Sequence, residues 1–267
     1  MVRSSPTESV LRQDRLVVLT AVTAMAALAW AYMIRAAQAM DRTGICECVG
    51  MAFGGPDSSP WSAWQLVPLF VMWAEMMVAM MLPSAAPVVV IFARVNRQRR
   101  EQDRPYLPAG LFLTGYFMVW GAFSLLAALG QWVLHDAALL SSTMKSSSSA
   151  FGGWLLIGAG IFQWTPWKRS CLAHCSSPLN FLLGSWREGA MGAVMMGIRH
   201  GAYCTGCCWL LMLVLFVAGV MNIWWILALT LLVVLERWVP QATHLSTGVG
   251  VVLVGCGLWM LGTGGWS

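Results

Sequence analysis

Charged side chains are scarce in this sequence. Asp, Glu, Lys and Arg make up 10% of its 267 residues, whereas soluble globular proteins carry about 25%. Apolar residues take their place, at 58% of the chain with a mean hydropathy of +0.69. This scarcity excludes an ordinary soluble domain. The net charge of +5 does not indicate nucleic-acid binding, because the basic residues lie in short loops between apolar runs.

Familiar catalytic motifs are also missing. The sequence has no phosphate-binding glycine loop, no hydrolase nucleophile elbow and no complete zincin motif. No internal repeat is apparent, and Ser146 to Ser149 is the only low-complexity patch. We therefore expect a single domain over residues 1–267 that is not an enzyme.

Long apolar runs are abundant, and several reach the roughly 20 residues that cross a bilayer. We predict an all-α fold, a polytopic transmembrane helix bundle of about seven spans. These spans cover residues 16–36, 66–92, 108–134, 151–167, 202–221, 223–239 and 246–263. The first run is longer than the roughly 7–15 apolar residues of a cleaved signal peptide. Residues 179–199 are predicted to form an amphipathic helix that lies at the interface or re-enters the membrane. If this segment crossed the membrane instead, the orientation of every later segment would invert.

Basic residues predict the orientation. Five arginines between Arg94 and Arg104 indicate a cytoplasmic loop, and the N-terminal arginines place the N-terminus on the same side. Lys168 and Arg169 mark a second cytoplasmic connection, while the uncharged segment Gly262 to Ser267 ends outside. The pattern predicts a multi-pass protein of the bacterial inner (cytoplasmic) membrane, in contact with membrane lipid, with a cytoplasmic N-terminus and an external C-terminus.

The second predicted span is rich in methionine. Met72, Met76 and Met80 recur every four residues and form one helical stripe, with Met77 and Met81 beside it. Thioethers are soft ligands that select Cu(I), and they need no deprotonation. Methionine is also a common filler of apolar packing, so ordinary core packing is an equal alternative.

An acidic residue and two prolines belong to the same span. Glu75 is costly at bilayer depth unless it faces a cavity, an ion path or a partner. We favour a ligand or a proton-coupled group over a protonated Glu75 in an interhelical hydrogen bond. Pro83 and Pro87 predict a kink that exposes backbone carbonyls around a cavity.

A second group of soft ligands follows the fourth span. Cys171 and Cys175 are four residues apart, with His174 between them, and form a plausible soft-metal capture loop. Lys168 and Arg169 are expected to lower the thiol pKa values. The alternative is a basic loop with reduced cytosolic thiols.

The sharpest pattern lies at the start of the fifth span. Cys204, Cys207 and Cys208 fall at i, i+3 and i+4, so a helix places all three thiols on one face. His200 lies one turn earlier and could join them. The alternative is close helix packing at the neighbouring glycines.

The remaining candidates carry weaker patterns. Cys46 and Cys48 lie in a predicted outer loop and are more simply incidental, and Cys256 is expected to be structural. Glu236 and Arg237 close the sixth span, where Glu236 is expected to pair locally or to serve as a ligand or relay.

Four of these motifs together resemble a known family. They are Met72-Trp73-x-x-Met76-Met77-x-Ala79-Met80-Met81-x-Pro83, Thr165-Pro166-x-Lys168-x-x-Cys171-x-x-x-Cys175, Trp186-x-x-Gly189-x-x-Gly192-Ala193, and Gly201-x-Tyr203-Cys204-x-Gly206-Cys207-Cys208-Trp209 leading to Gly219-x-Met221-Asn222. The chain resembles, over roughly residues 65–240, a bacterial family of integral membrane proteins described as metal-binding, some of which are labelled copper chaperones. The resemblance implies a metal, copper above all, and no defined reaction.

We therefore predict a membrane copper-handling protein that binds Cu(I) and moves it toward a cuproprotein. Two alternatives stay open: a non-catalytic subunit packed against other membrane subunits, and a membrane thiol–disulfide oxidoreductase using Cys204 and Cys207. The predicted metal ligands are Met72, Glu75, Met76, Met77, Met80, Met81, Cys171, His174, Cys175, His200, Cys204, Cys207 and Cys208.

Overall fold

The computed structural model describes residues 6–43, 63–100, 108–136, 148–239 and 242–263. Within these ranges the regular structure is entirely helical, which confirms the all-α prediction. The elements are α1 (Pro6–Thr43), η1 (Ala63–Gln65), α3 (Leu66–Arg100), α4 (Ala109–Asp136), α5 (Ser149–Gln163), α6 (Pro166–Ser176), α7 (Pro178–Ser185), α8 (Gly189–Leu213), α9 (Leu215–Ala218), α10 (Ile223–Trp238) and α11 (Ala242–Thr263).

Five stretches of the described chain are long and apolar enough to cross a membrane. They are Leu16–Gln38, Leu66–Arg99, Ala109–His135, Gly189–Ala218 and Thr243–Thr263. The other two predicted spans correspond to α5, with 15 residues, and α10, with 16 residues. Both are shorter than the roughly 20 residues that cross a bilayer at right angles. The helices thus indicate a multi-pass membrane protein.

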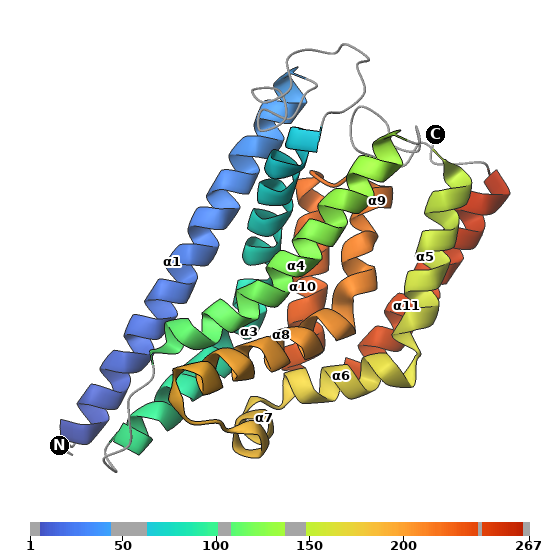
Figure 1. Cartoon of the computed structure of the whole chain (residues 1–267). Coiled ribbons are helices and arrows are strands. Elements are labelled where there is room, and N and C mark those ends of the chain that lie inside the picture. The colour runs from blue at the N-terminus through green and yellow to red at the C-terminus, as the bar shows by residue number, and fades with distance from the viewer. Residues whose placement is uncertain (1–5, 44–62, 101–107, 137–147, 240–241, 264–267) are drawn as a thin grey trace, which may run out of the picture.

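The long helices form a bundle with a clear centre (Figure 1). Helices α3, α4, α8 and α10 occupy the middle, α1 flanks one side, and α5 and α11 pack together on the other. Helices α6 and α7 lie at the end of the bundle where α3 ends and α8 begins. The described start of α1 and the described end of α11 lie at opposite ends of the bundle.

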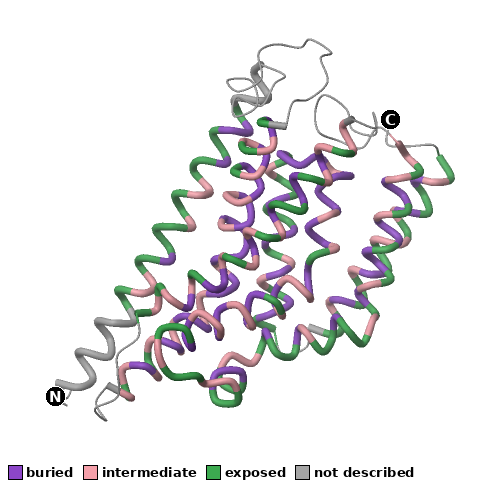
Figure 2. Tube along the Cα trace, viewed as in Figure 1, coloured by how far each residue is buried: buried purple, intermediate pink, exposed green. Residues whose placement is uncertain are grey.

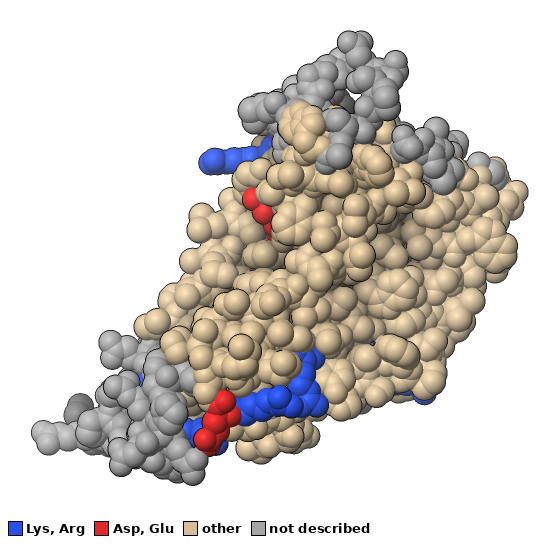
Figure 3. All heavy atoms as spheres, viewed as in Figure 1, with Lys and Arg blue, Asp and Glu red and all other residues tan. Residues whose placement is uncertain are grey.

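Burial follows this arrangement, with buried residues concentrated on the central helices (Figure 2). In its most apolar window α3 is 61% buried, whereas α1 is only 11% buried. Exposed apolar side chains such as Leu28, Leu126 and Trp224 cover the outside. On the face drawn in Figure 3, Lys and Arg gather mainly at the lower end and most of the middle is uncharged. An apolar band of this kind suits contact with lipid tails.

Helix α3 continues through its two prolines. Pro83 has no backbone N–H, so the carbonyl of Ala79, four residues earlier, loses its partner within the helix. The indole of Trp30 on α1 donates to this carbonyl at 3.0 Å. We expected such carbonyls to line a cavity. Instead, the one freed by Pro83 attaches α1 to α3.

Two glycines let α4 and α8 approach closely. A Cβ atom on Gly197 would lie 2.0 Å from the carbonyl oxygen of Phe112, and one on Gly115 would lie 2.0 Å from that of Val194. Small residues allow this contact between membrane helices. The close approach brings the Cys204 thiol of α8 against Tyr116 of α4.

Two predicted boundaries are wrong. The predicted fourth span runs to residue 167, but α5 ends at Gln163 and Thr165 accepts a hydrogen bond from the Lys168 amide to begin α6. The predicted interfacial helix 179–199 is instead divided. Gly189, at φ +80°, separates α7 from α8, so residues 189–199 form the first turns of a long helix. Glycine adopts positive φ without steric cost, which explains the break.

Candidate metal centre

The three cysteines of α8 share one buried face, as their spacing predicts. Cys204, Cys207 and Cys208 are each at most 2% exposed. The sulfurs of Cys207 and Cys208 donate to the carbonyl oxygen of Cys204, at 3.1 and 3.0 Å. Three thiols are thereby held within one helical turn in the centre of the bundle.

Arg237 of α10 meets this face. Its Nη2 donates to the sulfur of Cys204 at 2.9 Å and lies 3.7 Å from that of Cys207 and 3.8 Å from that of Cys208. Its Nη1 donates to the hydroxyl of Ser84 on α3. One guanidinium therefore joins α3, α8 and α10 around the thiols.

Tyr116 of α4 joins the thiols to the methionine-rich helix. Its hydroxyl lies 3.0 Å from the sulfur of Cys204 and donates to the carbonyl of Met81 at 3.3 Å. Tyr116 is fully buried. The sequence alone could not show whether the two sulfur-rich spans are neighbours; in the structure they are linked through one hydroxyl and one guanidinium.

A buried ion pair lies beside this cluster. Lys168 of α6 donates to both carboxylate oxygens of Glu236, at 2.7 and 2.8 Å, and also to the side-chain oxygen of Gln163. Ser246 of α11 donates to the same carboxylate at 2.7 Å. Glu236 was expected to pair locally or to serve as a ligand or relay; its ion-pair partner, Lys168, is instead distant in the chain. The adjacent Arg237 faces a different direction on the helix.

The cysteines after α5 lie on a helix, α6, rather than in a loop. Burial and then the charge of Cys207 raise the pKa of the Cys171 thiol. A hydrogen bond with Cys207, followed by burial, raises the pKa of Cys175 well above its ordinary value. The predicted lowering of these pKa values by Lys168 and Arg169 is wrong. Lys168 is committed to Glu236, and Arg169 donates to the carbonyl of Trp164.

The structure brings Cys175 to the α8 thiols but not the two histidines. His174 is exposed, contacts the carbonyl of Ser170 at 2.8 Å and stacks on Tyr203. His200 is 1% exposed and packs among aromatic rings, including those of Tyr116 and Phe181. Both histidines therefore pack against aromatic rings.

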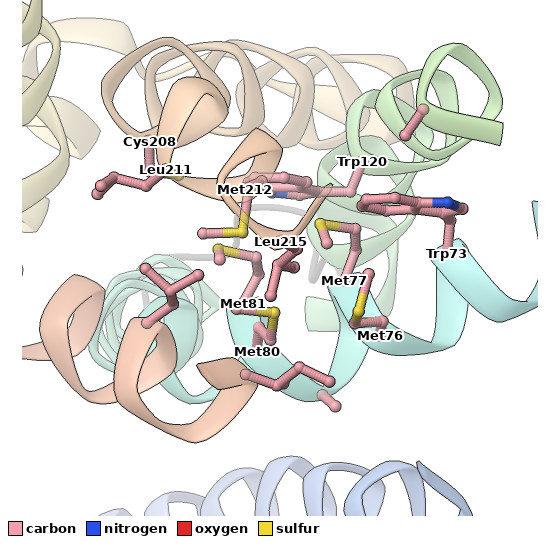
Figure 4. Close-up of a cluster of buried hydrophobic side chains, with 14 of the residues drawn as sticks. Trp73, Met76, Met77, Met80, Met81, Trp120, Cys208, Leu211, Met212 and Leu215 are labelled. Atoms are coloured by element: carbon pink, nitrogen blue, oxygen red, sulfur yellow. The ribbon is translucent and has the colours of Figure 1, made fainter. Parts of the chain in front are cut away.

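The methionines of α3 point into the core (Figure 4). Met76, Met77, Met80 and Met81 are each at most 1% exposed, and Met72 is 5% exposed. Met81 belongs to the same buried cluster as Met212 of α8, and Figure 4 draws the two side chains pointing toward one another. Cys204, Cys208 and Met212 recur every four residues on α8, so sulfur atoms line one face of that helix.

Glu75 differs from its methionine neighbours because it is only partly buried. One of its carboxylate oxygens is buried without a hydrogen-bond partner among the described residues. Cys46 and Cys48 lie outside the described residues. Cys256 on α11 is a free, partly buried thiol.

No ready-made metal site is visible. In the part of the chain that the structure describes, no three His, Cys, Asp or Glu side chains are placed to hold an ion together. The Nη2 atom of Arg237 lies within 3.8 Å of all three α8 sulfurs. A cationic nitrogen therefore lies next to all three sulfurs.

Sequence reasoning missed Arg237, Tyr116, Ser84 and Met212. Arg237 gave one usable signal, since a charged residue at the end of an apolar run needs a buried partner. Met212 gave another, because it continues the four-residue spacing of Cys204 and Cys208. Tyr116 and Ser84 had no pattern that distinguished them.

Comparison with known proteins agrees with this chemistry. A family model described as PpoB2, copper chaperone, matches residues 70–260. That range includes the methionine stripe, both helical cysteine groups and Arg237. No curated protein and no solved structure matches the chain. The family match covers more than half of the sequence, and the chain therefore belongs to the PpoB2 copper chaperone family.

Proposed function

We propose that this protein binds Cu(I) in the membrane through Cys204, Cys207 and Cys208 and passes it toward a cuproprotein. The observation that carries the proposal is the set of three buried thiols in contact with a single guanidinium. Thiolates and thioethers are the soft ligands that favour Cu(I). Copper is then cargo, and the role is non-catalytic.

Charge balance supports this assignment. Lys168 and Glu236 neutralise each other, whereas the described contacts of Arg237 include no carboxylate. Thiols must lose their protons to bind a metal. Two thiols that capture Cu⁺ release two protons and form a complex with one negative charge, [Cu(SR)₂]⁻. Arg237 would neutralise that charge once its Nη2 moves off the sulfurs.

The sulfur atoms beyond the thiols provide a second station. Cys208 and Met212 are one helical turn apart on α8, and Met212 belongs to the same buried cluster as Met81 of α3. Successive ligands on a helix face are separated by a rise of about 6 Å per four residues. Such spacing would let Cu(I) pass from thiolate to thioether without becoming a free ion. Glu75, Cys171, Cys175 and the two histidines remain candidate accessory ligands.

We further propose the orientation that the basic residues predict. In that arrangement α1, α3, α4, α5, α8, α10 and α11 cross the membrane alternately, with the N-terminus in the cytoplasm and the C-terminus outside. The course of the helices supports it, because α6 and the arginine-rich end of α3 lie at the same end of the bundle (Figure 1). The thiols would then lie toward the cytoplasmic side. A reporter enzyme that folds into an active form only outside the cytoplasm should be active when fused after residue 267, and a reporter that works only in the cytoplasm should be inactive there.

The test is anaerobic Cu(I) loading of the purified protein, followed by copper analysis and a copper-edge X-ray absorption spectrum. We expect the wild type to retain copper with sulfur ligands. The triple variant Cys204→Ser, Cys207→Ser, Cys208→Ser should lose this copper, whereas the matched variant Cys256→Ser should keep it. Equal copper in the triple variant and the wild type would refute the proposal.

A second variant separates binding from transfer. Met81→Leu with Met212→Leu conserves volume and should cost less than about 1.5 kcal/mol of stability per site. We expect it to bind copper at the thiols but to release it to an acceptor more slowly. Thiol trapping that instead found an exchangeable Cys204–Cys207 disulfide would favour the oxidoreductase alternative.

A further inference from the structure

A cavity with several charged and polar side chains in its wall opens beside the thiol cluster. It has a volume of about 460 Å³ and lies where α6, the end of α10 and the start of α11 meet. Its walls include Gln163, Lys168, Arg169, Ser176, Arg237 and Ser246. Arg237 thus lines the cavity and also contacts the thiols through its Nη2 atom.

Two buried donors in the cavity wall have no partner. Gln163 is 2% exposed and Arg237 is 6% exposed, yet Nε2 of Gln163 and Nε of Arg237 have no hydrogen-bond partner among the described residues. The side-chain oxygen of Gln163 accepts from Lys168, which has only donors, so the assignment of its amide is fixed. Buried polar groups normally find partners, so two unpaired donors on side chains that line one cavity favour an acceptor there, which a movement of either side chain would bring into contact.

The net charge of the cavity wall indicates that the ligand carrying this acceptor is an anion. Lys168 is neutralised by Glu236, which leaves Arg169 and Arg237 as net positive charges. No acidic residue is among those described as lining the cavity. Carboxylates are good ligands for such a site, because they accept several hydrogen bonds and pair with guanidinium groups.

We propose that this cavity binds a small anionic thiol with free carboxylates, and that Cu(I) is exchanged with the α8 thiols as the complex of that carrier. The inference rests on the proposed function and names the form in which copper arrives or leaves. The step is a ligand exchange without redox change. Two protein thiols replace two carrier thiolates on Cu⁺, and their protons pass to the departing carrier thiols. The carrier's carboxylates would bind Gln163 and Arg237, which draws the guanidinium off the thiols as copper is exchanged.

The carrier site can be tested without copper. The probe is S-methylglutathione, which keeps the carboxylates of a peptide thiol but has no free thiol, and calorimetry on the metal-free protein measures its binding. Ser176→Glu adds a negative charge at an exposed position in the cavity wall, and Ser170→Glu adds the same charge at an exposed position of α6 outside it. We expect Ser176→Glu, whose carboxylate would stand in the cavity wall, to weaken binding about tenfold, and Ser170→Glu, whose charge lies outside the wall and is screened by water, to weaken it much less.

A transfer assay then connects the cavity to copper. The initial rate of Cu(I) transfer from the glutathione complex should fall with Ser176→Glu and should fall much less with Ser170→Glu. Transfer from the complex of cysteamine, a cationic thiol, should not fall in either variant. Absence of S-methylglutathione binding to the wild type, or equal binding by both variants, would overturn this inference. The thiol site would survive that result, because its own test compares copper retention in the Cys→Ser variants.

Discussion

Replacing Arg237 by Gln tests the central feature of the metal centre. The change removes the only positive charge described in contact with all three α8 thiols, while an amide of similar polarity remains. We expect Arg237→Gln to bind Cu(I) more weakly. Copper binding changes the thiol cluster from neutral to negative, so the guanidinium stabilises the loaded state more than the empty one.

The magnitude follows from the geometry. The guanidinium of Arg237 lies within 3.8 Å of all three α8 sulfurs, so after Nη2 moves aside for copper it stays close enough to donate to a copper-bound thiolate. A hydrogen bond to a charged partner contributes about 1.5–3 kcal/mol, which corresponds to roughly a 10- to 150-fold change in affinity at 1.4 kcal/mol per factor of ten. Two unit charges 4 Å apart interact by about 4 kcal/mol at an effective dielectric constant near 20, which sets an upper limit.

The assay is anaerobic competition against a chromophoric Cu(I) chelator in detergent solution. Arg237→Lys keeps the charge but not the fork of donors, so its affinity should fall between those of the wild type and Arg237→Gln. Arg187→Gln removes an equal charge from an exposed position and serves as the matched control. Thermal unfolding of each variant shows whether the bundle is intact.

Two results would contradict this reasoning. If folded Arg237→Gln binds Cu(I) as tightly as the wild type, the guanidinium does not neutralise the loaded site. If Arg237→Gln binds more tightly, Arg237 acts mainly as a competitor for the sulfurs, and the assumed charge of the loaded site is wrong.

Three further predictions concern the scaffold around the site. Gly197→Ala places a methyl group 2.0 Å from the carbonyl oxygen of Phe112, so it should lower the free energy of unfolding by about 3 kcal/mol and lower the unfolding temperature. The control Gly121→Ala has open space around its Cβ and should not lower either quantity. Equal unfolding temperatures for the two variants would show that α4 and α8 are not in close contact. Lys168→Met leaves the Glu236 carboxylate buried without its cation and should lower the free energy of unfolding by about 3–5 kcal/mol. Adding Glu236→Gln should restore much of this stability in denaturation experiments. A double variant that is no more stable than Lys168→Met alone would contradict the pairing. Because the pKa of Cys171 is raised, its alkylation rate at neutral pH should be below that of an ordinary thiol and should still increase above pH 9. Mass spectrometry of the labelled peptide measures this rate. An alkylation rate that levels off near neutral pH would refute the raised pKa.

Several features followed from local sequence alone. The apolar runs predicted a multi-pass helical bundle, because hydrocarbon leaves backbone groups no partners outside a helix. The spacing of Cys204, Cys207 and Cys208 placed them on one face, and the four-residue recurrence of Met72, Met76 and Met80 predicted a stripe that proves to be buried. Both results depend only on helical periodicity, which every helix obeys.

The boundaries were less predictable because single residues decide them. Thr165 and Pro166 end one helix and begin the next, whereas hydropathy continues through Trp167. Gly189 interrupts a segment that otherwise has the composition of one amphipathic helix. Capping and positive φ depend on backbone geometry at one position, and a hydropathy window averages over that position.

The sequence by itself determined the class of the protein, the faces of its helices and the soft chemistry of its ligands. Only the tertiary structure decided which of those faces meet. It placed Arg237, rather than a nearby histidine, over the thiols, joined Glu236 to Lys168 instead of its neighbour, and buried Met81 and Met212 in one cluster. These contacts join residues that are far apart in the chain, and they depend on how closely α4 and α8 pack at Gly115 and Gly197. Periodicity within one helix carries no information about the partner across it.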